Sequence, residues 1–279
     1  MFKTALLSAA FAATTAGAHA APLTLDVFNP GEAAIFPVAS VLVAGARDAV
    51  LIDAQFSRGA ALQLADRIRA SGKRLTTIYI SHDDPDYYFG LDALHAAFPE
   101  AKIVATPPVI AGIARKKDAK VAYWGPILKD NAPHAIIMPQ PLQGDTITLE
   151  GQALHIDPNY VWIPSIKAVV GGVAVFNRLH VWTADAQTPA SRQQWLATLD
   201  RMAALKPQTV VPGHFAPGAP LTPDSIAYTR DYLLKFGDET AKAADAAALI
   251  ARMRQLYPDA GLPSALDISA KVAKGEMKW

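Results

Sequence analysis

The stretch from residue 81 to residue 90 holds the side chains of this chain that are best suited to chemistry. His82, Asp84 and Asp86 alternate along it. Imidazole nitrogens and carboxylate oxygens are common protein ligands of divalent metal ions. The apolar run 75–80, which is typical of a buried β-strand, comes directly before them. Because α/β proteins build their sites where strands end, the sequence predicts a functional loop at the rim of a sheet.

A second strand end brings another imidazole. The predicted strand 209–211 leads into a Pro-Gly-His sequence that ends at His214. Together with the imidazole and two carboxylates of the first loop, His214 would complete a ligand set that suits one divalent cation with open positions for water. Two carboxylates about 4 Å apart would otherwise repel by roughly 4 kcal/mol at an effective dielectric constant of 20. A cation or a shared proton is therefore expected between them.

A metal ion in this loop would permit hydrolysis. It would lower the pKa of a coordinated water, so that hydroxide forms near neutral pH and attacks a polarised carbonyl or phosphoryl centre. Asp86 could orient that water, and the Tyr87 hydroxyl could donate a hydrogen bond to the developing oxyanion. Asp86 and Tyr87 are therefore the predicted catalytic residues.

The same loop also has a purely structural interpretation. Asp84 followed by Pro85 is typical of an N-cap and the first residue of a helix, and Asp86 would then lie at the positive end of the helix dipole. A cap contributes about 1 kcal/mol to stability without any catalytic duty. The neighbouring His82 and the distant His214 are what favour a functional site over capping alone.

The first 20 residues have the pattern of a secretory signal peptide. Lys3 precedes a segment of small and apolar residues, and a small-x-small cleavage pattern ends at Ala20. We expect cleavage after Ala20 and a periplasmic or secreted protein. No later run approaches the roughly 20 apolar residues that a transmembrane helix needs, so no membrane span is expected in the mature protein.

Composition argues against several partners and sites. Cleavage would remove Lys3 and leave 25 Lys and Arg against 25 Asp and Glu. A chain with this balance has no excess of basic residues with which to bind nucleic acid. The chain has no Cys, which excludes disulfides, thiolate ligands and a thiol nucleophile. Because 51% of the residues are hydrophobic, we expect one domain over 21–279 with a large core.

Strands and helices alternate in the predicted secondary structure. The first half has strands at 38–44, 49–52, 76–80 and 103–105 and helices at 57–71 and 86–98. A hairpin is predicted to turn at Glu150, and Thr188 is predicted to cap a second helix-strand unit. A helical C-terminal extension is predicted from about residue 222. Two βα-rich halves around β hairpins predict a four-layer α/β sandwich with a site at one edge.

Three features stand in the order found in the metallo-β-lactamase fold superfamily, which the chain resembles over roughly residues 30–220. They are a strand ending at Asp53, the loop 81–87, and the strand-borne His214. The resemblance implies a four-layer αβ/βα sandwich, with two mixed β-sheets flanked by helices, that carries metal-dependent hydrolysis. Asp53 itself is expected to be a structural hydrogen-bond acceptor and not a ligand.

The ligand positions depart from the superfamily pattern, which is HxHxDH followed by a later His, an Asp and a final His. His82, Asp86 and His214 match this pattern. Asp84 and Tyr87 stand where the second and third His of the motif belong. The departures argue against a dinuclear zinc centre and imply one ion, which would be zinc or, because carboxylates replace imidazoles, iron or manganese.

Three further residues are candidates for the missing ligands or for substrate contacts. His155 is the nearest histidine for the intermediate position, although its sequence context differs. Where the superfamily has its bridging Asp, Gly172 is followed by Val173. His180 and Asp185 come shortly afterwards and could reach the pocket. A structural histidine and a loop cap are the respective alternatives.

The sequence therefore predicts an exported hydrolase that acts on a small ester, lactone or amide at an atypical site with one metal ion. The alternative is a metal-free protein of the same fold that binds a small molecule or a protein partner without turnover. The Ala-rich C-terminal helices are the candidate surface for a homo-oligomer.

Overall fold

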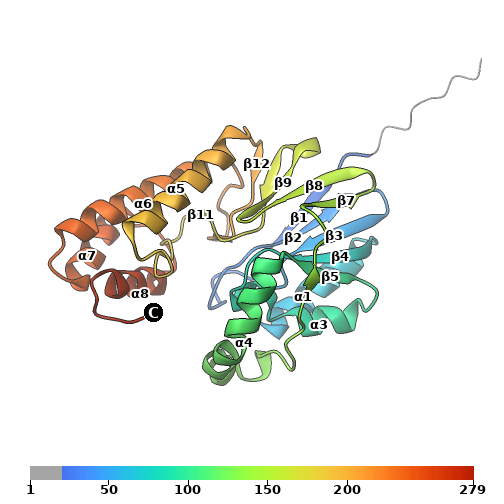
Figure 1. The fold of residues 1–279 in the computed structure, drawn as a ribbon, viewed down its shortest axis with the longest axis horizontal. Coiled ribbons are helices and arrows are strands. Elements are labelled where there is room, and N and C mark those ends of the chain that lie inside the picture. The colour runs from blue at the N-terminus through green and yellow to red at the C-terminus, as the bar shows by residue number, and fades with distance from the viewer. Residues whose placement is uncertain (1–20) are drawn as a thin grey trace, which may run out of the picture.

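Two mixed β-sheets lie face to face in the computed structural model, which describes residues 21–279 (Figure 1). The predicted signal peptide lies outside the described residues. The first sheet consists of β1 (Thr24–Phe28), β2 (Ser40–Ala44), β3 (Asp48–Ile52), β4 (Arg74–Ile80), β5 (Lys102–Ala105) and β6 (Gln140–Pro141), in that order. The pairings β1·β2 and β2·β3 are antiparallel, whereas β3 to β6 are parallel.

The second sheet has the order β12-β10-β9-β8-β7. Its strands are β7 (Thr146–Leu149), β8 (Gln152–Asp157), β9 (Tyr160–Ile163), β10 (Ala168–Val170) and β12 (Thr209–Val210). Only the β10·β12 pairing is parallel in this sheet. A separate short pair, β11 (Phe176–Asn177) and β13 (His214–Phe215), runs parallel and brings His214 beside Phe176.

Helices cover the outer face of each sheet (Figure 1). Beside the first sheet lie α1 (Arg58–Ala70), α2 (Pro85–Tyr88), α3 (Leu91–Ala97) and α4 (Pro107–Leu128). Beside the second lie α5 (Pro189–Ala204), α6 (Asp224–Lys242), α7 (Ala246–Leu256) and α8 (Pro263–Ala273). The segment predicted to be helical from about residue 222 corresponds to α6, α7 and α8. Within residues 21–279, no helix is both long and apolar enough to cross a membrane.

Alternating side chains divide the interior into three cores. In β3, Leu51 packs toward α1, whereas Val50 and Ile52 pack toward the second sheet. In β10, Val170 meets the first sheet and Val169 meets the C-terminal helices. These two strands therefore bury both of their faces, because successive side chains of a β-strand point to opposite sides of the sheet. Three buried interfaces between four layers confirm the predicted αβ/βα sandwich.

The predicted helix 86–98 is wrong as a single element, because the chain breaks it into α2 and α3 at Gly90. The Gly90 amide donates to the carbonyl of Gln55 at 2.9 Å. A Cβ atom at Gly90 would lie 2.0 Å from the Ala54 carbonyl oxygen. The turn after β3 thus packs directly against the backbone at this point, and the amide of Ala54 donates to the carbonyl of Tyr87 at 2.8 Å. This contact holds α2 against the end of β3.

Asp53 ties together the ends of three strands. Its carboxylate accepts hydrogen bonds from the Ser81 amide at 2.8 Å and from the Ser81 hydroxyl at 2.7 Å. The same hydroxyl accepts from the Gly172 amide at 2.8 Å. Asp53 follows β3, Ser81 follows β4 and Gly172 lies just beyond β10, so this buried chain of hydrogen bonds joins both sheets. Asp53 is the structural acceptor that the sequence predicted.

We predict that Asp53 makes the stability of the protein fall between pH 4 and pH 7. Burial raises the pKa of Asp53 to about 7 from its ordinary value of 3.8, although the hydrogen bonds from Ser81 oppose this shift. The folded state therefore holds a proton that the unfolded state has lost, so the stabilisation is complete below about pH 4 and is lost as the pH rises to about 7. At about 1.4 kcal/mol per pH unit, the decline is on the order of 4 kcal/mol.

Urea unfolding at pH 4 and at pH 7.5 measures this decline. Asp53→Asn should remove most of it, because the amide does not titrate. The exposed Asp66, whose side chain is 78% accessible, gives a control, since Asp66→Asn should leave the decline unchanged. An Asp53→Asn protein with the pH dependence of the wild type would contradict the assignment.

Candidate active site

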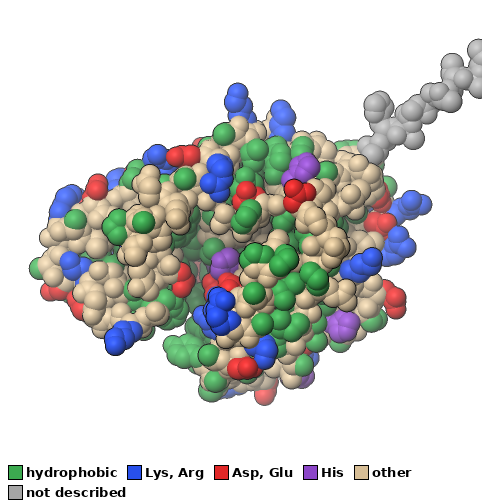
Figure 2. Space-filling model, viewed as in Figure 1, with side chains coloured by type: hydrophobic (Ala, Val, Ile, Leu, Met, Phe, Trp, Pro, Cys, Tyr) green, Lys and Arg blue, Asp and Glu red, His purple; other side chains and the backbone are tan. Residues whose placement is uncertain are grey.

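A cavity of about 650 Å³ opens between the loop that follows β4 and the C-terminal helical layer. Figure 2 shows histidine, acidic and basic side chains gathered beside the hollow in the middle of this face. The loop 82–87, α4 and α5 contribute to its walls, and so do His214 and the C-terminal Trp279. A concave site of this size suits a small molecule.

His82, Asp83 and Asp84 form one group on the wall of this cavity. The Nδ1 atom of His82 lies 3.3 Å from Asp84 Oδ2 and 3.8 Å from Asp83 Oδ1. Within the described chain, this is the one group of three or more His, Asp or Glu residues whose ligand atoms all lie within 4.8 Å of one another. Asp83 was missed by the sequence reasoning, because it falls between the alternating positions of the motif. Its carboxylate, directly after His82 in the sequence, could have indicated that Asp83 is a candidate ligand.

Two lysines from α4 reach this group. The Lys116 ammonium lies 2.9 Å from Asp83 Oδ1 and 3.4 Å from Asp84 Oδ1, and the Lys120 ammonium lies 3.8 Å from Asp84 Oδ1. Partial burial disfavours the charged form of Lys116, but attraction to Asp84 and Asp83 outweighs it and raises the pKa of Lys116. The two carboxylates therefore already have a cationic partner in the protein.

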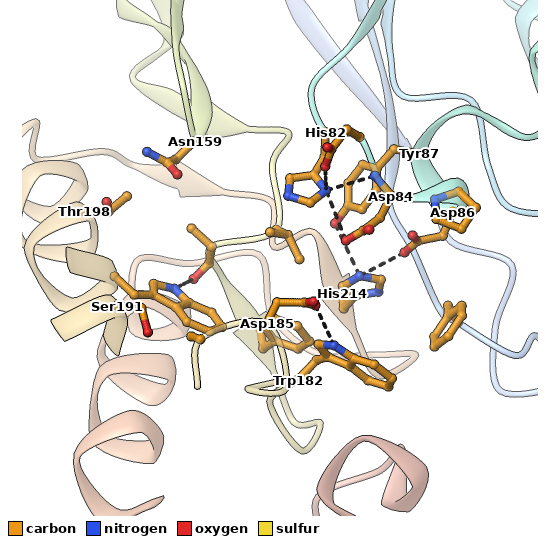
Figure 3. A pocket seen from close by; sticks show the side chains of 18 of the residues that line it. His82, Asp84, Asp86, Tyr87, Asn159, Trp182, Asp185, Ser191, Thr198 and His214 are labelled. Carbon is orange, nitrogen blue, oxygen red and sulfur yellow. Dashed lines mark hydrogen bonds and ion pairs between the residues drawn. The ribbon is translucent and has the colours of Figure 1, made fainter. Parts of the chain in front are cut away.

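Asp86, Tyr87 and His214 form a second, more deeply buried group (Figure 3). The Nε2 atom of His214 lies 3.2 Å from Asp86 Oδ2 and 3.3 Å from the Tyr87 hydroxyl. The Tyr87 hydroxyl also lies 3.4 Å from the carbonyl oxygen of Gly172. Burial, with a contribution from the charge of Asp86, holds the pKa of Tyr87 well above its usual value. Tyr87 is therefore a protonated hydrogen-bond donor and not a phenolate.

The predicted four-residue ligand set is thus divided in two. His82 and Asp84 belong to the group that contains Asp83, whereas Asp86 and His214 pair with each other. Both groups line the same cavity. Asp84 does occupy the N-cap position of α2, but its side chain makes no capping hydrogen bond. The capping interpretation of its carboxylate is therefore wrong.

Two of the further candidates lie away from the cavity. His180 is buried among the C-terminal helices, where its Nδ1 atom lies 3.0 Å from the Tyr232 hydroxyl. Burial, assisted by Arg254, lowers the pKa of His180 to about 4. His155 is exposed on β8, 3.3 Å from the Thr146 hydroxyl. The geometry therefore supports the structural alternative for His180 and gives His155 no place at the cavity.

Asp185 lines the cavity in a role that the sequence did not indicate. One of its carboxylate oxygens accepts from the indole of Trp182 at 2.8 Å, and the other accepts from the indole of Trp279 at 2.9 Å. The two indole rings meet edge to face, with their centroids 5.0 Å apart. Asp185 therefore fixes two aromatic rings that come from segments almost 100 residues apart in the sequence.

Aromatic residues form the rest of this wall. Phe36 lies edge to face with Trp124 at 5.4 Å and with Trp182 at 6.1 Å. Phe176 stacks on the imidazole of His214 at 5.1 Å. These rings and Trp195 line the cavity together with the acidic loop, residues 82–87. The site thus combines an apolar, ring-lined wall with a polar wall of carboxylates, imidazoles and ammonium groups.

The side-chain chemistry fits one divalent ion and not two. His82, Asp83 and Asp84 offer one imidazole and two carboxylates within a short distance, which is a usual donor set for zinc, iron or manganese. In the second group, the third partner is the neutral hydroxyl of Tyr87, and the neighbouring wall residue is the apolar Val173. A second ion would therefore find only one imidazole and one carboxylate there.

Comparisons with known proteins agree with this architecture. The sequence model of the metallo-beta-lactamase superfamily matches residues 34–214. No curated protein matches the sequence. A metallo-beta-lactamase family protein from Thermus thermophilus has a similar structure, with a TM-score of 0.62, 16% identity and coverage of 91% of each chain. A beta-lactamase domain protein from Burkholderia ambifaria reaches a TM-score of 0.63 at 15% identity, over 90% of this chain and 84% of that one.

Because the sequence identities are only 16% and 15%, the structural similarity is evidence for the fold alone. The sequence match, by contrast, covers well over half of the chain and includes the loop 82–87 and His214. Superfamily members are mostly hydrolases that use divalent metals, as the resemblance already implied. The chain belongs to the metallo-β-lactamase superfamily.

Proposed function

We propose that this chain is an exported hydrolase that acts on a small ester, lactone or amide with the help of one divalent ion. The observation that carries the proposal is the juxtaposition, in one cavity, of the group His82, Asp83 and Asp84 with the group Asp86, Tyr87 and His214. Export rests on the sequence pattern of residues 1–20.

His82, Asp83 and Asp84 would hold the ion, which would polarise the substrate and lower the pKa of water. The remaining chemistry falls to the second group. The Nε2 atom of His214 contacts both Asp86 and Tyr87, so this imidazole holds the Asp86 carboxylate in place. That carboxylate lines the cavity and can accept a proton from the attacking water and return it to the leaving group. The protonated Tyr87 hydroxyl can donate a hydrogen bond to an oxygen that gains negative charge.

The aromatic wall supports a substrate with a flat apolar part. Rings bind such a group by stacking and by burial of apolar surface, and they exclude water from the polar groups beside them. The cavity volume of about 650 Å³ sets an upper limit on the size of the substrate. A small ester or amide that carries an aromatic acyl group satisfies both conditions.

The alternative function is metal-free binding of a small molecule. The contacts of Lys116 with both carboxylates favour it, because these contacts neutralise the acidic loop without any bound ion. Metal content separates the two functions. A wild-type protein that holds less than roughly a tenth of an equivalent of metal after expression in metal-replete medium would support the alternative.

We predict that His82→Ala abolishes stoichiometric metal binding, since it removes the one imidazole of the ion-binding group. Inductively coupled plasma mass spectrometry of the purified protein measures the metal content. His155→Ala is the matched control, because His155 is exposed on β8, away from the cavity. Equal metal content in the wild type and in His82→Ala would exclude this group as the site.

A second prediction concerns the aromatic wall. Trp182→Ala should lower kcat/KM for 4-nitrophenyl phenylacetate by about tenfold relative to 4-nitrophenyl acetate, because the larger acyl group loses a ring contact worth about 1.4 kcal/mol. Tyr123→Ala is the control, since Tyr123 is 60% exposed and does not line the cavity. If the ratio of the two kcat/KM values does not change in Trp182→Ala, the wall does not bind the acyl group.

A further inference from the structure

The acidic loop has an ammonium group where a metal ion would be expected to balance its charge. Lys116 contacts a carboxylate oxygen of Asp83 at 2.9 Å and one of Asp84 at 3.4 Å. Only 20% of the Asp83 side chain, 23% of Asp84 and 31% of Lys116 are accessible to solvent. Because these groups are largely shielded, their interaction is screened less by water and salt than that of a surface ion pair.

Backbone packing fixes this pairing. Gly112 lies one turn before Lys116 in α4, so both residues are on the same face of the helix. A Cβ atom at Gly112 would lie 1.8 Å from Asp83 Oδ2, which means that the Asp83 carboxylate rests directly on the helix backbone. Only a glycine at this point admits that approach. The carboxylate is thereby placed within reach of the residue one turn further on.

The neighbouring lysine of the same helix behaves differently. Lys117 pairs with Asp118 at 2.7 Å, and it does not line the cavity. Lys120, one turn beyond Lys116, approaches Asp84 at 3.8 Å and lies over the ring of Trp279 at 5.6 Å. The face of α4 that looks into the cavity thus carries two ammonium groups directed at the acidic loop, and Lys116 makes the closer contacts.

A metal ion and the ammonium would share one oxygen of Asp83, and at Asp84 they would use the two oxygens of one carboxylate. The Asp83 oxygen nearest to His82 Nδ1 is the one that Lys116 contacts. A divalent ion bound by His82, Asp83 and Asp84 would lie within a few ångströms of the ammonium, and like charges at that distance repel strongly in a partly buried site. The flexible side chain of Lys116 can swing away, but it would have to give up both carboxylate contacts.

We propose that Lys116 is the resident cation of the acidic loop, and that a divalent ion binds His82, Asp83 and Asp84 only by displacing its ammonium group. The identity of the ion-binding group rests on the proposed function. Lys116 thus sets how tightly the site holds metal. It is a positioning residue for the carboxylates and a competitor of the ion.

Isothermal titration of the purified protein with ZnCl₂ tests this proposal. Lys116→Met, which keeps an unbranched side chain one atom shorter but removes the charge, should bind Zn²⁺ at least about tenfold more tightly than the wild type. Lys116→Arg keeps the charge and should show no gain. Lys117→Met, one residue along the same helix, is the matched control and should bind like the wild type.

A graded variant covers the case in which Lys116→Met fails to fold, which thermal unfolding would reveal. Lys120→Met removes the more distant charge and should give a smaller gain, about threefold. Equal Zn²⁺ affinity in the wild type and the charge-removing variants would overturn the proposal, and so would an absence of binding in all of them.

The outcomes also separate this proposal from the hydrolase. If removal of the Lys116 charge strengthens Zn²⁺ binding but no variant hydrolyses the 4-nitrophenyl esters, the role of Lys116 stands and the proposed ester hydrolysis fails. If the wild type hydrolyses the esters and its Zn²⁺ affinity does not depend on Lys116, the hydrolase stands and the role of Lys116 fails.

Discussion

The buried carboxylate of Asp53 is the constraint on which the arrangement of the site depends. Through Ser81 it connects the end of β3 to the end of β4, and the Ser81 hydroxyl continues the connection to Gly172 beyond β10. The backbone at Asp53 has a φ of 67°, an unfavourable conformation for a non-glycine residue, which these hydrogen bonds help to maintain. The three connected segments carry or border the acidic loop, and their hydrogen bonds to Asp53 and Ser81 hold the two sheets together beside that loop.

The charged groups of residues 83–86 have ionic partners within the protein. The carboxylates of the acidic loop meet ammonium groups from α4, and Asp86 meets the imidazole of His214. This matters because an unpaired charge in a partly buried cavity is costly. In the superfamily pattern, histidines stand at the positions of Asp84 and Tyr87. Here the ammonium groups of Lys116 and Lys120 balance the charge of Asp83 and Asp84, and the Tyr87 hydroxyl lies beside His214.

The cavity joins parts of the chain that are remote in sequence. Phe36 comes from the segment before β2, Trp182 from the loop after β11, and Trp279 from the C-terminus. Asp185 holds two of these rings through their indole nitrogens. The polar wall, in contrast, is almost continuous in sequence, since most of it comes from residues 82–87. Both halves of the sandwich therefore contribute aromatic rings and polar groups to the cavity.

The sequence by itself determined the layers and the acidic loop. The alternation of apolar residues in β3 and the run before His82 are local patterns, and local patterns are enough to place strands and the loop at a strand end. Long-range geometry decided the rest. Three features depend on contacts between distant segments, which spacing along the chain does not encode. They are the packing of Asp83 on Gly112, the pairing of Lys116 with the carboxylates of the acidic loop, and the position of His180 in the helical core. Only the tertiary structure could show them, because the energies of buried charges depend on which groups become neighbours after folding.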